Sequence, residues 1–261
     1  MQSRPFSYLF SISYFGARYK GWAIQPGQST IQGKLEKVLK FVLGHDDFSI
    51  LGGSRTDAGV SCTGGFVQIF LRKETDLEAL LPSINQYLPQ DIRLNSVQEV
   101  ATNFNLIQSV IQKTYRYYFS NSNEFHPFSS AFLFNISENL NWETMKESAQ
   151  LFVGTHDFKA FCTPSSNKTD YVREIFSSGF YSSNEFLGQF FPQEIHYFEV
   201  TGRGFLHHQV RMMVNGILKT GNGEWRLEEI QNRLTNPISC EKISSAPANG
   251  LILWETVLVL K

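Results

Sequence analysis

The stretch STIQGKLEKVLKFVLG, at 29–44, restricts the fold of this chain more than any other. Its apolar residues recur at spacings of three and four, which predicts an amphipathic helix. They are Ile31, Leu35, Val38, Leu39, Val42 and Leu43. Ser29 or Thr30 can accept the first free N–H groups of this helix, and Gly44 can end it in the left-handed conformation. The segments 6–14 and 48–54 on either side are typical of strands, so we expect mixed α and β structure.

The rest of the chain alternates in the same manner. Further strands are predicted at 65–71, 109–120, 173–181, 194–202 and 251–260, and further helices at 141–154 and 205–221. Connections of hairpin length favour an α+β fold of two similar halves over a parallel, doubly wound sheet. The stretch TNFNL interrupts the pattern near residue 105. We therefore expect one domain at 1–105 and a second at 106–261.

Composition limits the class of protein. With 42% hydrophobic residues among 261, the chain can bury one large core or two modest ones. No run of about 18 apolar residues occurs, which argues against a membrane span, and the N-terminal segment lacks the uninterrupted apolar run of a signal peptide. Three cysteines without a CxxC pair fit a reducing compartment, so the cytoplasm is the expected location. A net charge of −1 means that a nucleic-acid partner must meet a local basic patch.

Residues 52–62, GGSRTDAGVSC, place Arg55 and Asp57 among small residues in a loop between two predicted strands. One interpretation is a turn in which Asp57 caps a nearby N–H group and Arg55 is solvated. The other is a carboxylate that attacks or protonates a substrate, while Arg55 keeps it ionised or binds a phosphate. An aspartic-protease site also begins with Asp-x-Gly, but it needs a second such loop and apolar residues before the Asp. Arg55 and Thr56 occupy those positions here.

The predicted helix at 205–221 carries a polar stripe of His208, Arg211 and Asn215 beside its apolar one. Such a stripe is either a solvated face or a binding face. Residues 201–226 favour binding, because they hold four Lys or Arg side chains and two His but a single acidic residue; the cations are Arg203, Arg211, Lys219 and Arg226. His207 and His208 are adjacent, so we expect them to point to different faces and to form no metal site.

The predicted strand QKTYRYYF has Lys113, Tyr115, Tyr117 and Phe119 on one face and Arg116 and Tyr118 on the other. Aromatic side chains on strands usually belong to the core. The alternative is that one Tyr at the end of the sheet stacks on a nucleobase, with Lys113 or Arg116 near a phosphate.

Together these segments resemble the TruA-type pseudouridine synthases, which isomerise uridine in tRNA. The loop GSRTDAGV resembles the family signature GRTDAGV, KTYRY resembles its Lys/Arg-x-Tyr-x-Tyr motif, and GFLHHQVRMMVNGILKTG is similar to its AFLHHMVR helix. YKGW, IQGKLEKVL, HDFKAFC and GLILWE also resemble family segments in the expected order, so the resemblance covers nearly the whole chain.

The resemblance implies a role for each motif. Asp57 is the catalytic residue, with Gly59 also matching the signature; Tyr115 packs on the target base, and Arg211 pairs with the catalytic carboxylate. The target is a uridine on the 3′ side of the anticodon stem-loop, and neither a cofactor nor a metal is needed. We expect further RNA contacts from six side chains: Arg55, Lys113, Arg116, Arg203, His207 and His208.

The resemblance also implies an architecture of two ferredoxin-like halves with antiparallel or mixed sheets. They form a pseudo-symmetric body with a central active-site cleft, and the enzyme is a homodimer with RNA across both subunits. No DNA or membrane partner is expected.

Three positions depart from the family pattern. Ile107 stands where the family usually has an Arg, Phe15 replaces an acidic residue, and Ser54 replaces a Gly. A paralogue that acts on another tRNA or on ribosomal RNA is one alternative. A non-catalytic RNA-binding protein on the same fold is another. The third is a hydrolase or phosphotransferase with an Asp-x-Gly carboxylate, which would require metal ligands or a phosphate loop.

Overall fold

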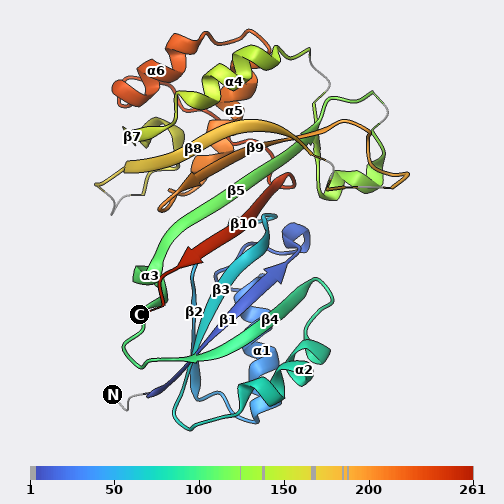
Figure 1. Cartoon of the computed structure of the whole chain (residues 1–261), viewed down its shortest axis with the longest axis vertical. Helices are drawn as coiled ribbons and strands as arrows, with labels where there is room; N and C mark the ends of the chain where they lie inside the picture. Colours follow the sequence, from blue (N-terminus) through green and yellow to red (C-terminus); the bar gives the residue numbers. More distant parts are fainter. Residues whose placement is uncertain are drawn as a thin grey trace. The chain divides into compact units, whose positions relative to one another are not determined.

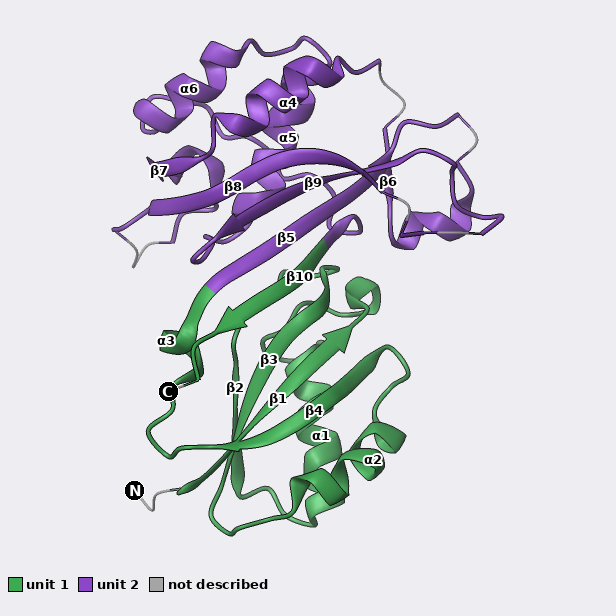
Figure 2. Ribbon diagram, viewed as in Figure 1, with its two compact units in different colours: residues 1–111, 252–261 green, residues 112–251 purple. Residues whose placement is uncertain are grey.

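A computed structural model describes residues 4–123, 125–136, 139–165, 169–183, 185–186 and 188–260. The chain forms two compact units (Figure 2): unit 1 holds residues 1–111 and 252–261, and unit 2 holds residues 112–251. Each unit combines a sheet with helices, which confirms the predicted α+β class (Figure 1).

Unit 1 is a ferredoxin-like βαββαβ fold. Its elements are β1 (Phe6–Tyr14), the short 3-10 helix η1 (Gly16–Arg18), α1 (Ile31–Leu43), β2 (Phe48–Gly52), β3 (Ser61–Leu71), α2 (Leu77–Tyr87), β4 (Ile92–Val100), α3 (Leu106–Ser109) and β10 (Leu251–Leu258). Strand β1 lies between β3 and β4 and is antiparallel to both. β2 pairs with the second half of β3, and β10 pairs in parallel with the first residues of β3.

Helix α1 has the predicted ends. The Thr30 side chain accepts a hydrogen bond from the Gly33 N–H group at 3.3 Å, and Gly44 ends the helix with φ of 75°. Helix α2 was not predicted, because Pro82 lies inside it and breaks the helical pattern; Asp76 caps its first turn instead.

Unit 2 contains the same β-α-β-β-α order, with two short strands and a further helix added to it. Its elements are β5 (Val110–Ser120), η2 (Pro127–Ala131), β6 (Phe134–Asn135), α4 (Trp142–Gln150), β7 (Gly154–Asp157), η3 (Lys159–Phe161), β8 (Val172–Ser183), β9 (Ile195–Gly202), α5 (Gln209–Gly221) and α6 (Leu227–Thr235). The sheet runs β5-β9-β8-β7, and α4, α5 and α6 lie together on one face of it (Figure 1). Its core is strongly aromatic: Tyr117, Phe119, Phe152, Phe158, Phe161 and Phe198 are all fully buried.

The boundary between the units differs from the predicted 105/106. The C-terminal residues 252–261 belong to unit 1, whereas the prediction placed them in the second domain. The physical reason is that β10 pairs with β3, and Leu258 packs against a cluster of Leu9, Phe104 and Leu106. Sequence periodicity identifies a strand but not the sheet that it joins.

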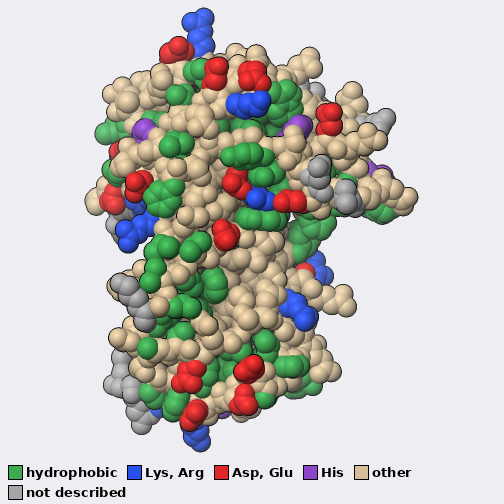
Figure 3. Space-filling model, viewed as in Figure 1, with side chains coloured by type: hydrophobic (Ala, Val, Ile, Leu, Met, Phe, Trp, Pro, Cys, Tyr) green, Lys and Arg blue, Asp and Glu red, His purple; other side chains and the backbone are tan. Residues whose placement is uncertain are grey.

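Helix α5 begins at Gln209, four residues later than predicted. His208 takes the left-handed conformation with φ of 62°, and a helix cannot continue through such a residue. Within the part of the chain that the structure describes, no helix is both long and apolar enough to cross a bilayer. On the face drawn in Figure 3, acidic and basic side chains are interspersed, in keeping with the net charge.

Candidate active site

The predicted catalytic loop joins β2 to β3 and alternates between exposed and buried side chains. Arg55 and Ala58 are exposed, Thr56 is buried, and Asp57 is half-buried. The Asp57 carboxylate therefore comes directly after the Thr56 side chain, which points into the protein. This is the geometry of a group presented by a fixed loop.

Backbone hydrogen bonds hold this loop against the segment that follows β1. The Trp22 N–H group donates to the Thr56 carbonyl at 3.1 Å, and the Gly59 N–H group donates to the Tyr19 carbonyl at 3.1 Å. Within the loop, the Val60 N–H group donates to the Asp57 carbonyl at 3.2 Å and closes a turn.

Two glycines allow this close approach of backbone to backbone. A Cβ atom on Gly16 would lie 2.0 Å from the Val60 carbonyl oxygen, and one on Gly21 would lie 2.8 Å from the Thr56 carbonyl oxygen. Gly21 also has φ of 94°, which other residues rarely adopt. Sequence reasoning used YKGW only as part of the resemblance and missed its structural role. The signal was present, since two glycines five residues apart follow a strand directly.

Tyr115 lies on β5, where it is half-buried and paired with Val200 of β9. Its ring meets the Phe205 ring edge to face, with centroids 5.2 Å apart. Tyr117 and Phe119, farther along the same face, are fully buried. The core interpretation therefore holds for Tyr117 and Phe119, whereas Tyr115, in the middle of β5, is only half-buried, and its stacking on a nucleobase stays a prediction.

Arg211 lies on α5 and is fixed by the segment 244–246. Its Nε atom donates to the Ala246 carbonyl at 2.6 Å, and the Ala246 N–H group donates back to the Arg211 carbonyl at 3.0 Å. One turn on, the Asn215 side chain donates to the Ser244 carbonyl at 2.9 Å. The polar stripe of α5 is therefore only partly solvated, because its residues are half-buried and the segment 244–246 contacts it.

The Arg211 charge acts on the sheet as well. Burial raises the pKa of the Tyr117 hydroxyl above its usual range, and the positive charge of Arg211 opposes that rise. The Tyr117 hydroxyl is buried and makes no hydrogen bond to another described residue.

The two histidines differ from the expectation that they point to different faces. Their rings stack with centroids 3.8 Å apart. The left-handed backbone of His208 turns the chain so that adjacent side chains lie side by side. Both are tied to Thr163, whose N–H group donates to the His207 carbonyl at 3.0 Å and whose hydroxyl lies 2.9 Å from His208 Nδ1.

The predicted cations differ in how exposed they are. Arg55 and Arg203 are exposed, and Lys113 is half-buried. Arg116 forms ion pairs with Glu199 at 2.7 Å and Glu185 at 2.6 Å.

Two details weaken the predicted basic surface. Burial lowers the pKa of Arg116, but hydrogen bonds with Tyr118 and Glu199 outweigh this and raise it, so the side chain stays charged and engaged. Lys219, counted above as part of the basic stretch, is paired with Glu224. The exposed positive charge is therefore smaller than the sequence suggested.

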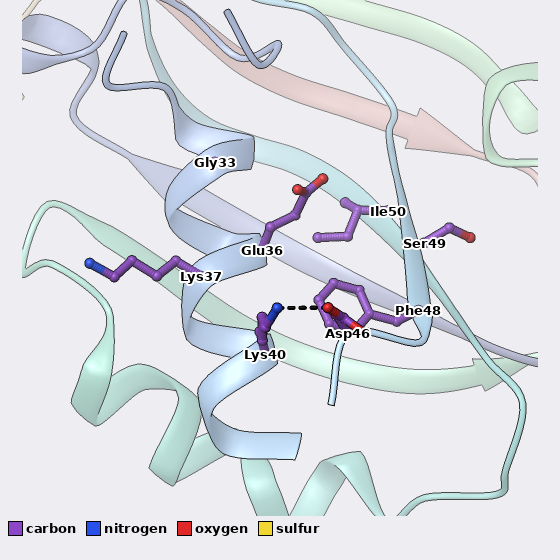
Figure 4. A pocket seen from close by; sticks show the side chains of 8 residues that line it. All are labelled: Gly33, Glu36, Lys37, Lys40, Asp46, Phe48, Ser49 and Ile50. Carbon is purple, nitrogen blue, oxygen red and sulfur yellow. Dashed lines mark hydrogen bonds and ion pairs between the residues drawn. The ribbon is translucent and has the colours of Figure 1, made fainter. Parts of the chain in front are cut away.

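A separate hollow of about 640 Å³ lies in unit 1 between α1 and the chain that leads into β2. Lys40 reaches across it to Asp46, at 2.6 Å (Figure 4). Its lining residues are Gly33, Glu36, Lys37, Lys40, Asp46, Phe48, Ser49 and Ile50. None of them belongs to the candidate site.

Comparisons with known proteins identify the family of the chain. The family model of tRNA pseudouridine synthases matches residues 148–257. A tRNA pseudouridine synthase A 2 of Bacillus cereus is 34% identical over 252 residues, covering 95% of this chain and 97% of that protein. A tRNA pseudouridine synthase A of Bacillus pumilus is 31% identical over 94% of this chain and 96% of its own.

The family model and these relatives define the protein as an isomerase of the pseudouridine synthase class. The chain belongs to the tRNA pseudouridine synthase A family. Among solved structures, the archaeal box H/ACA sRNP Nop10-Cbf5 complex matches with a TM-score of 0.35 and 11% identity, over 81% of this chain and 44% of that one. That likeness is too distant to add to the argument.

Proposed function

We propose that this protein converts uridine to pseudouridine on the 3′ side of the anticodon stem-loop of tRNA. It works in the cytoplasm, as a homodimer with RNA lying across both subunits. The observation that carries the proposal is the half-buried Asp57, held on a loop whose backbone is fixed on both sides of it. Relatives that match over 95% of the chain support the substrate class.

The reaction conserves composition. The bond between N1 of uracil and C1′ of ribose breaks, the uracil turns, and a bond between C5 and C1′ forms. The proton on C5 leaves to solvent, and N1 takes one up. No electron is gained or lost overall, so the chemistry requires no redox cofactor.

Asp57 carries the central step. Its carboxylate either attacks C1′ or removes a ribose proton to give a glycal, and on both routes it must be ionised beside positive charge that develops on the sugar. In this proposal Arg211 keeps the carboxylate ionised and oriented, as the family resemblance implies. The fixed position of Arg211 against Ala246 supports such a role, since an anchored cation loses little entropy on pairing.

In this proposal Tyr115 and Arg55 bind the target nucleotide. The target nucleotide must leave its stack to reach a half-buried carboxylate, and the exposed Arg55, on the same loop as Asp57, stabilises the flipped nucleotide. Tyr115 then stacks on the detached uracil while it turns.

Phosphate binding rests on the exposed cations. Arg203 and Arg55 are available in unit 2 and unit 1 respectively, with Lys113, His207 and His208 as the further predicted contacts. Arg116 would have to leave two carboxylates before it met a phosphate, so we assign it the least weight among the predicted RNA contacts.

The test uses tRNA transcripts that carry tritium on C5 of uridine. Wild-type protein is expected to release tritium. We expect Asp57→Asn to lower the rate of release by more than about 10³-fold, because Asn has nearly the same volume but cannot act as nucleophile or base. Circular dichroism and tRNA binding of the variant should match those of the wild type. Full release by Asp57→Asn would remove the proposed role, and binding without release by the wild type would favour a non-catalytic RNA-binding protein.

A second substrate class is favoured by one observation. Ile107 is 52% exposed on α3, where the resemblance implies an Arg, so an expected basic contact is replaced by an apolar surface. Ribosomal RNA or another tRNA is the alternative target. Mass-spectrometric mapping of pseudouridine in RNA from cells with and without the gene separates these targets.

A further inference from the structure

A buried hydrogen bond joins the catalytic loop to the end of β1 and has no part in the chemistry proposed above. The hydroxyls of Tyr14 and Thr56 are 2.7 Å apart. Both side chains are buried, with 6% and 7% of their surfaces exposed. Leaving either hydroxyl unpaired in such a place is costly, so this contact fixes the Thr56 side chain.

Thr56 is the residue before Asp57, and the structure holds it at two points. Its side chain is held by Tyr14, at the end of β1, and its carbonyl accepts from the Trp22 N–H group at 3.1 Å. The peptide that joins Thr56 to Asp57 therefore has its plane set by groups outside the loop. The Asp57 carboxylate can then change direction only by rotation about bonds within Asp57, which are its backbone torsions and its side-chain torsions.

Tyr14 is also locked in place. Its backbone pairs with Cys62 of β3 and with Ile92 of β4, and its ring packs at 6.1 Å from the ring of Trp22. A hydroxyl on a ring that a central strand holds in this way can fix the position of a loop to which it is hydrogen-bonded. Placement errors of about 1 Å at a reacting group can lower a rate by about 10²-fold.

We propose that Tyr14 is a positioning residue of the isomerisation, and that it acts through Thr56 on the direction of the Asp57 carboxylate. The proposal rests on the function proposed above. It deepens that function by adding a residue to which the resemblance assigned no role and that meets no substrate, because Tyr14 is buried.

The test is Tyr14→Phe, which removes one hydroxyl and keeps the ring. We expect kcat to fall between about tenfold and a hundredfold, while KM and tRNA affinity change less than about twofold. Tyr8→Phe is the matched control. Tyr8 is buried on the same strand, and its hydroxyl accepts from the Thr75 N–H group at 3.1 Å, far in sequence from the loop. It should lower the melting temperature to a similar extent and leave kcat unchanged.

Variants of Thr56, whose hydroxyl pairs with that of Tyr14, give an independent test. Thr56→Val should reproduce the loss of Tyr14→Phe, and Thr56→Ser, which keeps the hydroxyl, should restore most of kcat. The double variant Tyr14→Phe/Thr56→Val should be no slower than either single one, because the two groups act as one unit. If Tyr14→Phe fails to fold, the Thr56 variants decide the matter. Equal kcat in Thr56→Val and wild type, or equal loss in Tyr14→Phe and Tyr8→Phe, would overturn the proposal.

Hydrogen exchange separates this inference from the proposed function. Wild-type protein that releases no tritium would contradict the function alone. The amides of Gly59 and Val60, which donate within and beside the loop, should then still exchange faster in Tyr14→Phe than in Tyr8→Phe. Unchanged exchange at both amides would contradict the positioning role whatever the activity.

Discussion

The two units present their candidate residues in different ways. In unit 1, Asp57 lies on a loop outside regular secondary structure, and its position comes from backbone contacts with residues 16–22 and from the Tyr14–Thr56 hydrogen bond. In unit 2, Arg211 and Tyr115 lie on a helix and a strand, and their positions follow from regular secondary structure. A loop can be fixed as firmly as a helix where glycines let two backbones touch. The two arrangements should nevertheless respond differently to mutation.

The largest effect expected in unit 2 is that of Arg211→Ala. We expect turnover of bound tRNA to fall by about 10²-fold or more, with a much smaller change in affinity, because the proposed partner of Arg211 is the Asp57 carboxylate. Single-turnover tritium release at saturating enzyme measures this. An altered affinity and salt dependence with unchanged turnover would instead make α5 a phosphate-binding face, and the proposed Asp57–Arg211 pair would be wrong.

Tyr115 tests whether unit 2 supplies a ring or a hydroxyl. Tyr115→Phe keeps the stacking face and its contact with Phe205, so it should retain within about tenfold of wild-type turnover. Tyr115→Ala removes roughly 1 to 3 kcal/mol of stacking and should lose more. The comparison is made with the same tritium assay. Equal losses in the two variants would assign the role to the hydroxyl.

Gly21 tests the backbone contact that fixes the unit 1 loop. Gly21→Ala should lower the free energy of unfolding by about 3 kcal/mol, because it combines positive φ with a Cβ atom 2.8 Å from the Thr56 carbonyl oxygen. Gly27→Ala is the control, since Gly27 has φ of 70° but nothing within 4 Å of its Cβ position, and it should cost about 1 kcal/mol. Urea unfolding measures both. Equal costs would show that the loop gives way and is not fixed by residues 16–22.

Sequence periodicity predicted most of this fold because each element has a local signature. Strand β1 and helix α1 were predicted almost to the residue, and Thr30 and Gly44 supplied the ends of the helix. It missed α2, β4 and α6, and it could not assign β10, whose partner strand β3 is about 190 residues away in the chain. The local pattern of hydrophobic residues does not show which distant strand a given strand pairs with.

The candidate site shows the same limit. The motif residues Asp57, Tyr115 and Arg211 could be selected from sequence, since the types and their spacing carry the resemblance. Their supports could not: the Tyr14–Thr56 bond and the Arg211–Ala246 bonds join residues 42 and 35 positions apart. The stacking of His207 on His208 follows from one left-handed residue, which adjacency alone did not reveal.

The smallest effect expected is that of Arg203→Ala, and it tests how unit 2 meets the RNA. Arg203 is exposed beyond the end of β9 and lies on no catalytic motif. If it contacts one phosphate, its removal should lower the slope of log affinity against log salt by roughly 0.7 to 0.9 and leave turnover of bound tRNA intact. Arg116→Ala is the informative contrast, because that guanidinium is paired with Glu185 and Glu199. Removing it frees two carboxylates, so it should destabilise unit 2 while leaving the salt slope unchanged. A reduced slope for Arg116→Ala and none for Arg203→Ala would mean that RNA displaces the ion pairs, and that the paired cations of unit 2 are its true binding surface.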